Sequence, residues 1–185
     1  MVGVNMSNPI EIDDAIVLLL GTPAGGTPAG EIQGVTRLEK LIFLLEKETS
    51  SNKWLDEDAE FEAYNFGPFS QKVYQAVDML GAAGLVLDSG SAAADESDTW
   101  EERNGIDNLA SDPYTTRDFK LTDRGWRYFR ALTNELPPGA LDELARFKER
   151  FASMPLRQLV RYVYQRYDEF TKNSLIRDDI LGIRR

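Results

Sequence analysis

The chain has 185 residues, of which 42% are hydrophobic and 28% are charged. These values suit one globular domain, or a small domain with a helical extension, and exclude collagen-like, fibrous and wholly disordered chains. The sequence contains no His and no Cys. It therefore excludes Ser-His and Cys-His nucleophile pairs, imidazole and thiolate metal sites, haem and iron–sulfur ligation, and disulfides.

Acidic residues outnumber basic ones by 31 to 21, and the imbalance is uneven along the chain. Residues 1–87 contain 13 acids and 5 bases, residues 88–118 contain 9 and 2, and residues 119–185 contain 9 and 14. The front of the chain is acidic and the back is basic. Such asymmetry bears on partners and association rather than on the fold.

The first part of the chain is predicted to hold two helices. Apolar residues recur at helical spacing over Ile10–Leu20, and Gly21–Gly30, the pentapeptide GTPAG written twice, follows as a loop. Thr36–Glu39 has the pattern of a capping box, which would start a second helix that runs to about Thr49. Its apolar stripe is wide, so we expect this helix to be buried on more than one side and central to the core.

A third helix is predicted after an extended segment. Asp58–Phe66 alternates weakly and is expected to enter a turn at Gly67-Pro68. Ser70 is the expected N-cap of a helix that runs to about Leu80, where Gly81 and Gly84 end it.

Two strands and four more helical segments complete the prediction. The strands cover Leu85–Leu87 and Tyr114–Thr122, and Asp88–Pro113 between them has the composition of a mobile acidic loop. Helices are expected over 126–136, 141–151 and 155–167, the last with Pro155 at its first position, and one or two further turns over 174–183.

Several short stretches resemble known winged-helix proteins. They are Gly34–Leu45, Tyr64–Ser70, Leu80–Val86 and Phe119–Thr122 with Gly125. As a set they resemble prokaryotic winged-helix proteins, distantly similar to the PadR and MarR regulators, and LEKLIFLL and FGPFS also resemble the Panacea domain of antitoxins. The resemblance covers about residues 34–125.

The resemblance implies a mainly α fold with a small antiparallel β wing. Residues 1–125 would form a winged helix-turn-helix core with an N-terminal helix and an acidic wing at 88–118. Residues 126–185 would form a C-terminal helical extension packed on this core.

The resemblance also implies a recognition helix over residues 70–80, which would lie in the major groove of bound DNA. Its candidate contacts are Ser70, Gln71, Lys72 and Gln75. Lys72 is its only cation, and the wing carries nine acids and two bases. Phosphate contacts need Lys and Arg, so the charge pattern disfavours DNA reading by this helix.

Arginines alternate with tyrosines in the basic C-terminal part. The candidate interface residues are Arg127, Arg157, Arg161, Tyr162 and Arg166. Arg and Tyr are enriched at protein interfaces, and they also suit stacking on nucleic-acid bases. The same arginines could instead form a solvated helix face, or pair with acids at the front of the same chain or of a second copy.

Two further clusters have a structural and a functional interpretation. The acids of Asp56–Glu62 could hold a hard cation if they share a strand face, but a solvated edge is the favoured interpretation. Tyr64, Phe66, Phe69 and Tyr74 could line a partner pocket, but core packing under a turn is favoured. The Gly-rich decapeptide lacks the Lys-Ser/Thr ending of a P-loop.

The sequence therefore predicts no catalytic, cofactor-binding or metal site. We expect a non-enzymatic regulatory module that acts mainly through protein–protein contact, antitoxin-like or a defence accessory by resemblance. The alternative is a transcriptional regulator that binds DNA through residues 70–80. The expected partner is another protein or a second copy, DNA is possible, and no membrane is involved. The early apolar run at Ile16–Leu20 is too short for a signal-peptide core, so a cytoplasmic protein is expected.

Overall fold

The computed structural model describes residues 8–92 and 115–183. Within these ranges the α-helices are α1 (Ile12–Gly21), α2 (Val35–Glu48), α3 (Gln71–Ala82), α5 (Asp123–Thr133), α6 (Ala140–Phe151), α7 (Leu156–Arg166) and α8 (Arg177–Leu181). The strands are β1 (Glu31–Gln33), β2 (Glu62–Tyr64), β3 (Gly67–Phe69), β4 (Val86–Ala92) and β5 (Thr115–Leu121). Two short 3-10 turns are η1 (Ser51–Lys53) and η3 (Asp168–Phe170).

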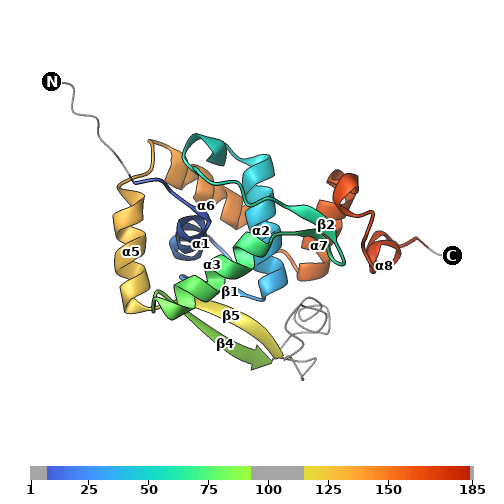
Figure 1. The fold of residues 1–185 in the computed structure, drawn as a ribbon, viewed down its shortest axis with the longest axis horizontal. Helices are drawn as coiled ribbons and strands as arrows, with labels where there is room; N and C mark the ends of the chain where they lie inside the picture. Colours follow the sequence, from blue (N-terminus) through green and yellow to red (C-terminus); the bar gives the residue numbers. More distant parts are fainter. Residues whose placement is uncertain (1–7, 93–114, 184–185) are drawn as a thin grey trace.

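The main sheet has three antiparallel strands in the order β1-β5-β4. Ile32 lies opposite Phe119, and Val86 lies opposite Leu121, and all four side chains are buried. Apart from η1, the elements follow one another as α1, β1, α2, β2, β3, α3, β4 and β5, and the three-stranded sheet beside these helices is compatible with a winged-helix shape whose wing is β4 and β5 (Figure 1). The predicted mainly α fold with a small antiparallel sheet is confirmed. Residues 93–114, most of the predicted acidic wing, lie outside the described part.

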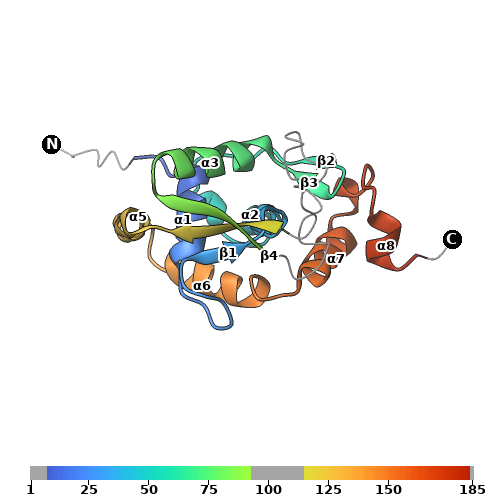
Figure 2. The same cartoon turned by 90° about the horizontal axis from the view of Figure 1, so that it is seen from below.

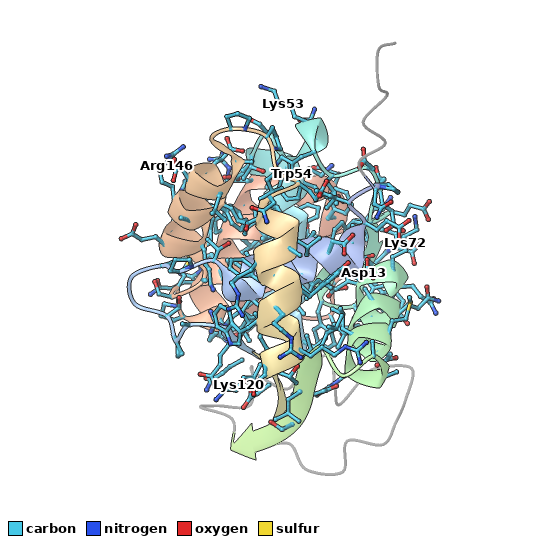
Figure 3. The ribbon with its side chains drawn as sticks, turned by 90° about the vertical axis from the view of Figure 1, so that its left-hand side faces the viewer. Asp13, Lys53, Trp54, Lys72, Lys120 and Arg146 are labelled. Carbon is cyan, nitrogen blue, oxygen red and sulfur yellow. The ribbon has the colours of Figure 1, made fainter. Side chains whose placement is uncertain are left out.

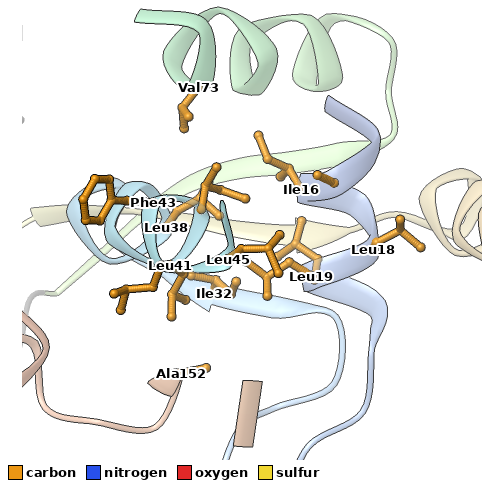
Figure 4. Packing of buried hydrophobic residues seen from close by; sticks show 14 of the residues in the cluster. Ile16, Leu18, Leu19, Ile32, Leu38, Leu41, Phe43, Leu45, Val73 and Ala152 are labelled. Carbon is orange, nitrogen blue, oxygen red and sulfur yellow. The ribbon is translucent and has the colours of Figure 1, made fainter. Parts of the chain in front are cut away.

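Helices α1 and α2 form the centre of the core. Every residue of α1 from Asp14 to Gly21 is buried, as are ten of the fourteen residues of α2. A helix that is apolar all round is covered on several sides. Helix α3 lies on one side of the α1–α2 pair and α6 on the other (Figure 2), and Ile16, Leu38 and Val73 point toward a common centre (Figure 4). The predicted central position of the second helix is confirmed.

The C-terminal helices pack against this core. Tyr164 of α7 is buried, and its ring lies against Gly67 of β3. Gly67 has a φ of +86°, and a Cβ there would approach Tyr164 Cε1 to 2.6 Å, so the position requires glycine. Beyond α7, the Leu175 backbone N–H donates to the Asn65 carbonyl at 2.9 Å. The hairpin of β2 and β3 is therefore held from the C-terminal side.

Both of the first two helices begin elsewhere than predicted. Helix α1 begins two residues later than Ile10, because Glu11 is its extended N-cap and donates its backbone N–H to the Asp14 carboxylate. Helix α2 begins before Thr36, at Val35, where the chain leaves β1 through Gly34 at a φ of +88°. The predicted capping box is wrong, because the Thr36 hydroxyl lies inside the first turn and caps nothing.

Three smaller predictions are also corrected. The turn between β2 and β3 lies at residues 65–66, and Gly67-Pro68 pairs within β3 opposite Tyr64 and Ala63. A two-strand ribbon has only edge strands, so Pro68 is tolerated there. Gly81 does not end α3, which runs to Ala82, and Pro155 is the N-cap of α7 rather than its first residue.

Candidate functional site

Helix α3 begins at a buried cap. Ser70 accepts a hydrogen bond from the Val73 N–H at 3.3 Å and donates its hydroxyl to the Ala59 carbonyl at 2.5 Å. Its side chain is fully buried. The predicted N-cap is confirmed, and the candidate recognition residue Ser70 positions the helix rather than facing outward.

A buried ion pair in α2 fixes the same helix start. The Glu39 carboxylate accepts from the Ser70 backbone N–H at 2.8 Å and lies 3.1 Å from Lys40 Nζ. Lys40 Nζ also donates to the Pro68 carbonyl at 3.0 Å. Both side chains are fully buried. Each charge is matched by its neighbour and by backbone groups, which is the condition for keeping ions out of water.

Lys72, the single cation of α3, is bound by acids from the preceding loop. Its Nζ lies 3.4 Å from a Glu57 oxygen and 3.3 Å from a Glu60 oxygen, and it donates to the Asp58 carbonyl at 2.9 Å. Residues 58–61 are not part of a strand, so Asp58, Glu60 and Glu62 do not share a strand face. The acidic run instead supplies two carboxylates to one lysine.

Arg117 joins the wing to α3 in the same way. Its Nη2 lies 2.5 Å from the Asp88 carboxylate and 3.3 Å from the Asp78 carboxylate. Burial acts to lower the pKa of Arg117, but the hydrogen bond and charge of Asp88, with those of Asp78, outweigh it and raise the pKa. The guanidinium is thus matched by two carboxylates on adjoining elements.

The outward side of α3 carries amides and apolar groups. Gln71 and Gln75 are exposed, and Met79 has an exposed fraction of 62%. Beside them, a row of rings runs from Tyr64 through Phe69 to Tyr74, with centroids 5.0 and 5.4 Å apart. We call the surface made by Gln71, Gln75, Met79 and this aromatic row the α3 face.

The aromatic cluster is split between the core and this surface. Phe66 is buried, as the core-packing interpretation requires, whereas Phe69 and Tyr74 are half-buried and Tyr64 is 39% exposed. Tyr64 is more exposed than a core residue, so one edge of the aromatic row is accessible to solvent. Aromatic side chains with a polar tip are enriched at interfaces.

The predicted C-terminal interface residues hold the end of the chain in place. Arg157 lies 3.0 Å from the Asp179 carboxylate, and Arg161 Nε donates to the Ile180 carbonyl at 2.7 Å. Ile180 is buried. These two arginines of α7 therefore dock α8.

Tyr162 and Arg166 bind an acid from the front of the chain. The Glu48 carboxylate, at the end of α2, accepts from the Tyr162 hydroxyl at 2.8 Å and from Tyr167 at 2.9 Å. Arg166 Nε lies 3.1 Å from it and Arg150 Nη1 lies 3.7 Å away. We call these five side chains the Glu48 cluster. Pairing with an acid of the same chain, one of the open alternatives, holds for Arg166.

Arg127 behaves differently from the other candidate interface residues. It lies on α5 with Arg124 and Arg130, three residues apart on either side, and all three are exposed. Gly125, Phe129 and Leu132 form the buried side of the same helix. Among the described residues, none of these arginines makes an ion pair.

Sequence reasoning missed the buried charges. Lys148 of α6 is fully buried and donates to the carbonyls of Leu20 and Thr22, both at 2.8 Å, at the end of α1. Burial lowers its pKa from 10.5 to about 8. A lysine at helical spacing among apolar residues, between Phe147 and Phe151 on either side, is the only local signal of this role.

Residues 8–92 and 115–183 contain neither a cluster of metal ligands nor a membrane-spanning helix. No group of three or more acidic side chains in these ranges is arranged to hold a metal ion. None of the helices in them has the length and apolar character needed to cross a bilayer. Comparison with known proteins found no family model that matches the chain and no matching curated protein.

Proposed function

We propose that this chain is a non-enzymatic regulatory module with a winged-helix core that acts mainly through protein–protein contact at the α3 face. One observation carries the proposal. Lys72 of α3 and Arg117 of β5 are each matched by two carboxylates, and Lys120, the other described cation of the wing, pairs with Glu31. A phosphate would have to displace these carboxylates before it could contact Lys72 or Arg117. Nucleic-acid affinity comes largely from Lys and Arg that neutralise phosphates and so release the counterions condensed on the nucleic acid.

The composition of the α3 face also supports a protein partner. The residues that define it are amides, a methionine and partly exposed rings, and Asp78, the exposed acid of α3 next to Met79, is paired with Arg117. Tyr, Phe and Met are enriched in the buried centre of protein interfaces, where charged residues are depleted. An antitoxin-like or defence-accessory role in the cytoplasm comes from the resemblance of residues 38–45 and 66–70 to the Panacea domain and belongs to this proposal.

The second candidate is a transcriptional regulator that reads DNA through α3. The exposed amides of Gln71 and Gln75 favour it, because Gln can form a bidentate contact with adenine in the major groove. In this case Ser70 would position the helix and Lys72 would have to exchange Glu57 and Glu60 for a phosphate.

Fluorescence anisotropy with a duplex from the upstream region of the gene and a scrambled duplex separates the two candidates. Between about 50 and 200 mM salt, we expect no specific binding. Specific binding with a steep salt slope, lost in Lys72→Glu or Gln75→Ala, would establish the DNA-reading candidate instead. Thermal unfolding of both variants checks that the fold is intact.

A further inference from the structure

Helix α5 carries a charged surface that the fold does not use. Arg124, Arg127 and Arg130 occupy successive positions along its exposed side, and within the described residues none has an ion-pair partner. Most other cations in these ranges are bound by carboxylates or carbonyls, as Arg117 and Arg161 are. Three unmatched arginines on one helix face attract anions over about 8 Å at physiological salt.

An unmatched acidic surface lies directly beside α5. The Tyr128 hydroxyl of α5 donates to the Asp14 carboxylate in the first turn of α1. Asp13 precedes Asp14 in the chain, and the Glu11 N–H donates to the Asp14 carboxylate. Asp56 and Glu57 accept from the backbone N–H groups of Ile10 and Ile12. Asp14 itself is buried, whereas Glu11 and Asp56 are exposed and Asp13 and Glu57 are half-buried. We call the set Glu11, Asp13, Asp56 and Glu57 the α1 acids.

The α1 acids have too few cations around them. Lys72, which contacts Glu57, is the only cation that forms an ion pair with any of them among the described residues. Burial, followed by the charges of Asp14 and Glu57, raises the pKa of Asp13 above its ordinary value. The contributions of Asp14 and Glu57 to this shift show that neighbouring acids repel the charge of Asp13, although burial is the larger cause.

The two surfaces lie side by side on one face of the molecule. In the view onto α5, Asp13 lies on one side of the helix, and Lys53 and Arg146 lie along the upper edge (Figure 3). Acid and base are thus adjacent, and among the described residues no ion pair joins the α5 arginines to the α1 acids within one chain. A surface of this kind is complementary to a copy of itself.

We propose that a second copy of this chain docks on α5, with the α5 arginines of one protomer against the α1 acids of the other. A two-fold axis that runs between α5 and the start of α1 makes this contact twice, because in an isologous interface residue i meets j and j meets i. Tyr128 lies at the seam between the two charged halves, and Arg with Tyr suits such a position. This inference goes beyond the proposed function, because it concerns a second surface, at α5 and the start of α1, and not the α3 face.

A charge exchange tests the contact. Sedimentation velocity of the full chain at about 50 mM salt should show a dimer that dissociates as salt rises, because exposed ion pairs are screened. Arg127→Glu and Asp13→Lys should each raise the dimer dissociation constant by about tenfold or more, because each places like charges together twice. Lys172→Glu, an exposed cation without an ion pair among the described residues and outside this face, is the matched control and should not change it.

Mixing the two variants gives the decisive result. In a heterodimer of Arg127→Glu with Asp13→Lys, one contact is native and the other is reversed, so affinity should return to within a few-fold of the wild type. This recovery cannot come from a variant that has failed to fold. A monomeric wild type at low salt, or two variants that do not restore each other, would overturn the proposal.

Two further outcomes distinguish failure of the dimer proposal from failure of the proposed function. If Arg127→Glu leaves the dimer intact but abolishes binding to duplex DNA, the α5 arginines contact phosphate and the dimer proposal is wrong. If the wild type is monomeric and also does not bind duplex DNA, the dimer is overturned while protein contact at the α3 face stands.

Discussion

The Glu39 carboxylate accepts a hydrogen bond from the backbone N–H of Ser70, which lies 31 residues further along the chain. Glu39 is in α2 and Ser70 is the N-cap of α3, so this contact sets one helix against the other. Lys40 completes it, because its ammonium pairs with the other Glu39 oxygen and with the Pro68 carbonyl. The position of α3, and with it the α3 face, depends on a buried ion pair rather than on apolar packing alone.

Removing one charge of this pair should be costly. We expect Lys40→Met to lower the free energy of unfolding by about 3–5 kcal/mol, because it leaves Glu39 buried without its cation. The double variant Glu39→Gln/Lys40→Met should recover part of that loss, since neither charge then remains. Urea unfolding followed by circular dichroism measures both, and a double variant that is less stable than Lys40→Met would contradict this account.

Lys148 should make stability depend on pH on the alkaline side. Its pKa is about 8 in the folded protein and 10.5 when exposed. Between these values the unfolded chain binds more protons than the folded protein, so the free energy of unfolding rises with pH. Above about pH 10 the tyrosines oppose this rise, because burial and Glu48 raise the pKa of Tyr167 to about 12 in the folded state.

The measurement is urea unfolding between about pH 7.5 and 9.5, where ordinary tyrosines, with a pKa of about 10, remain mostly protonated. We expect the wild type to gain up to about 2 kcal/mol over this range, since one pKa unit corresponds to 1.36 kcal/mol. Lys148→Met should lack this gain. An equal pH dependence in both proteins would show that Lys148 does not titrate there.

The Glu48 cluster should behave as one coupled unit. Tyr162→Phe and Tyr167→Phe each remove a hydroxyl that donates to Glu48, and each should lower the free energy of unfolding by about 1–2 kcal/mol. Because both share one carboxylate, their effects should not add in the double variant. Tyr64→Phe, whose ring is exposed, is the matched control. Strict additivity would mean that Glu48 does not couple the two.

Arg161→Glu should release α8 rather than a partner. The substitution removes the donor to the Ile180 carbonyl and places an acid near Asp179. Hydrogen exchange should then speed up over residues 177–181, with Lys172→Glu as the control. Unchanged protection of α8, together with a loss of self-association, would return Arg161 to the list of interface residues.

The sequence predicted what local pattern determines. The apolar periodicity of α2 and the N-cap at Ser70 were correct, because both depend on residues close together in the chain. The capping box at Thr36 was wrong, because α2 already begins at Val35 and Glu39 accepts from the Ser70 N–H instead of the start of its own helix. No local pattern distinguishes a glutamate that caps its own helix from one that binds a distant amide.

For charged residues, local sequence patterns predict contacts with distant residues even less well. Glu48 lies 114 residues before Tyr162, and Lys148 lies 128 residues after Leu20. Such pairs exist only once the core brings α2, α6 and α7 together, so charge counts alone could not separate arginines bound inside the chain from those on α5. Only the structure shows that the arginines bound within the chain and the arginines of α5, which form no ion pair among the described residues, lie on different elements.

The most direct test of the central claim compares duplex binding by the wild type and by Glu57→Gln/Glu60→Gln, which frees Lys72 of both carboxylates. At about 50 mM salt the account predicts no binding by the wild type and weak, sequence-independent binding by the variant, with a shallow salt slope for one added phosphate contact. Binding by the wild type that is equal to that of the variant, and that is lost in Lys72→Glu, would contradict it.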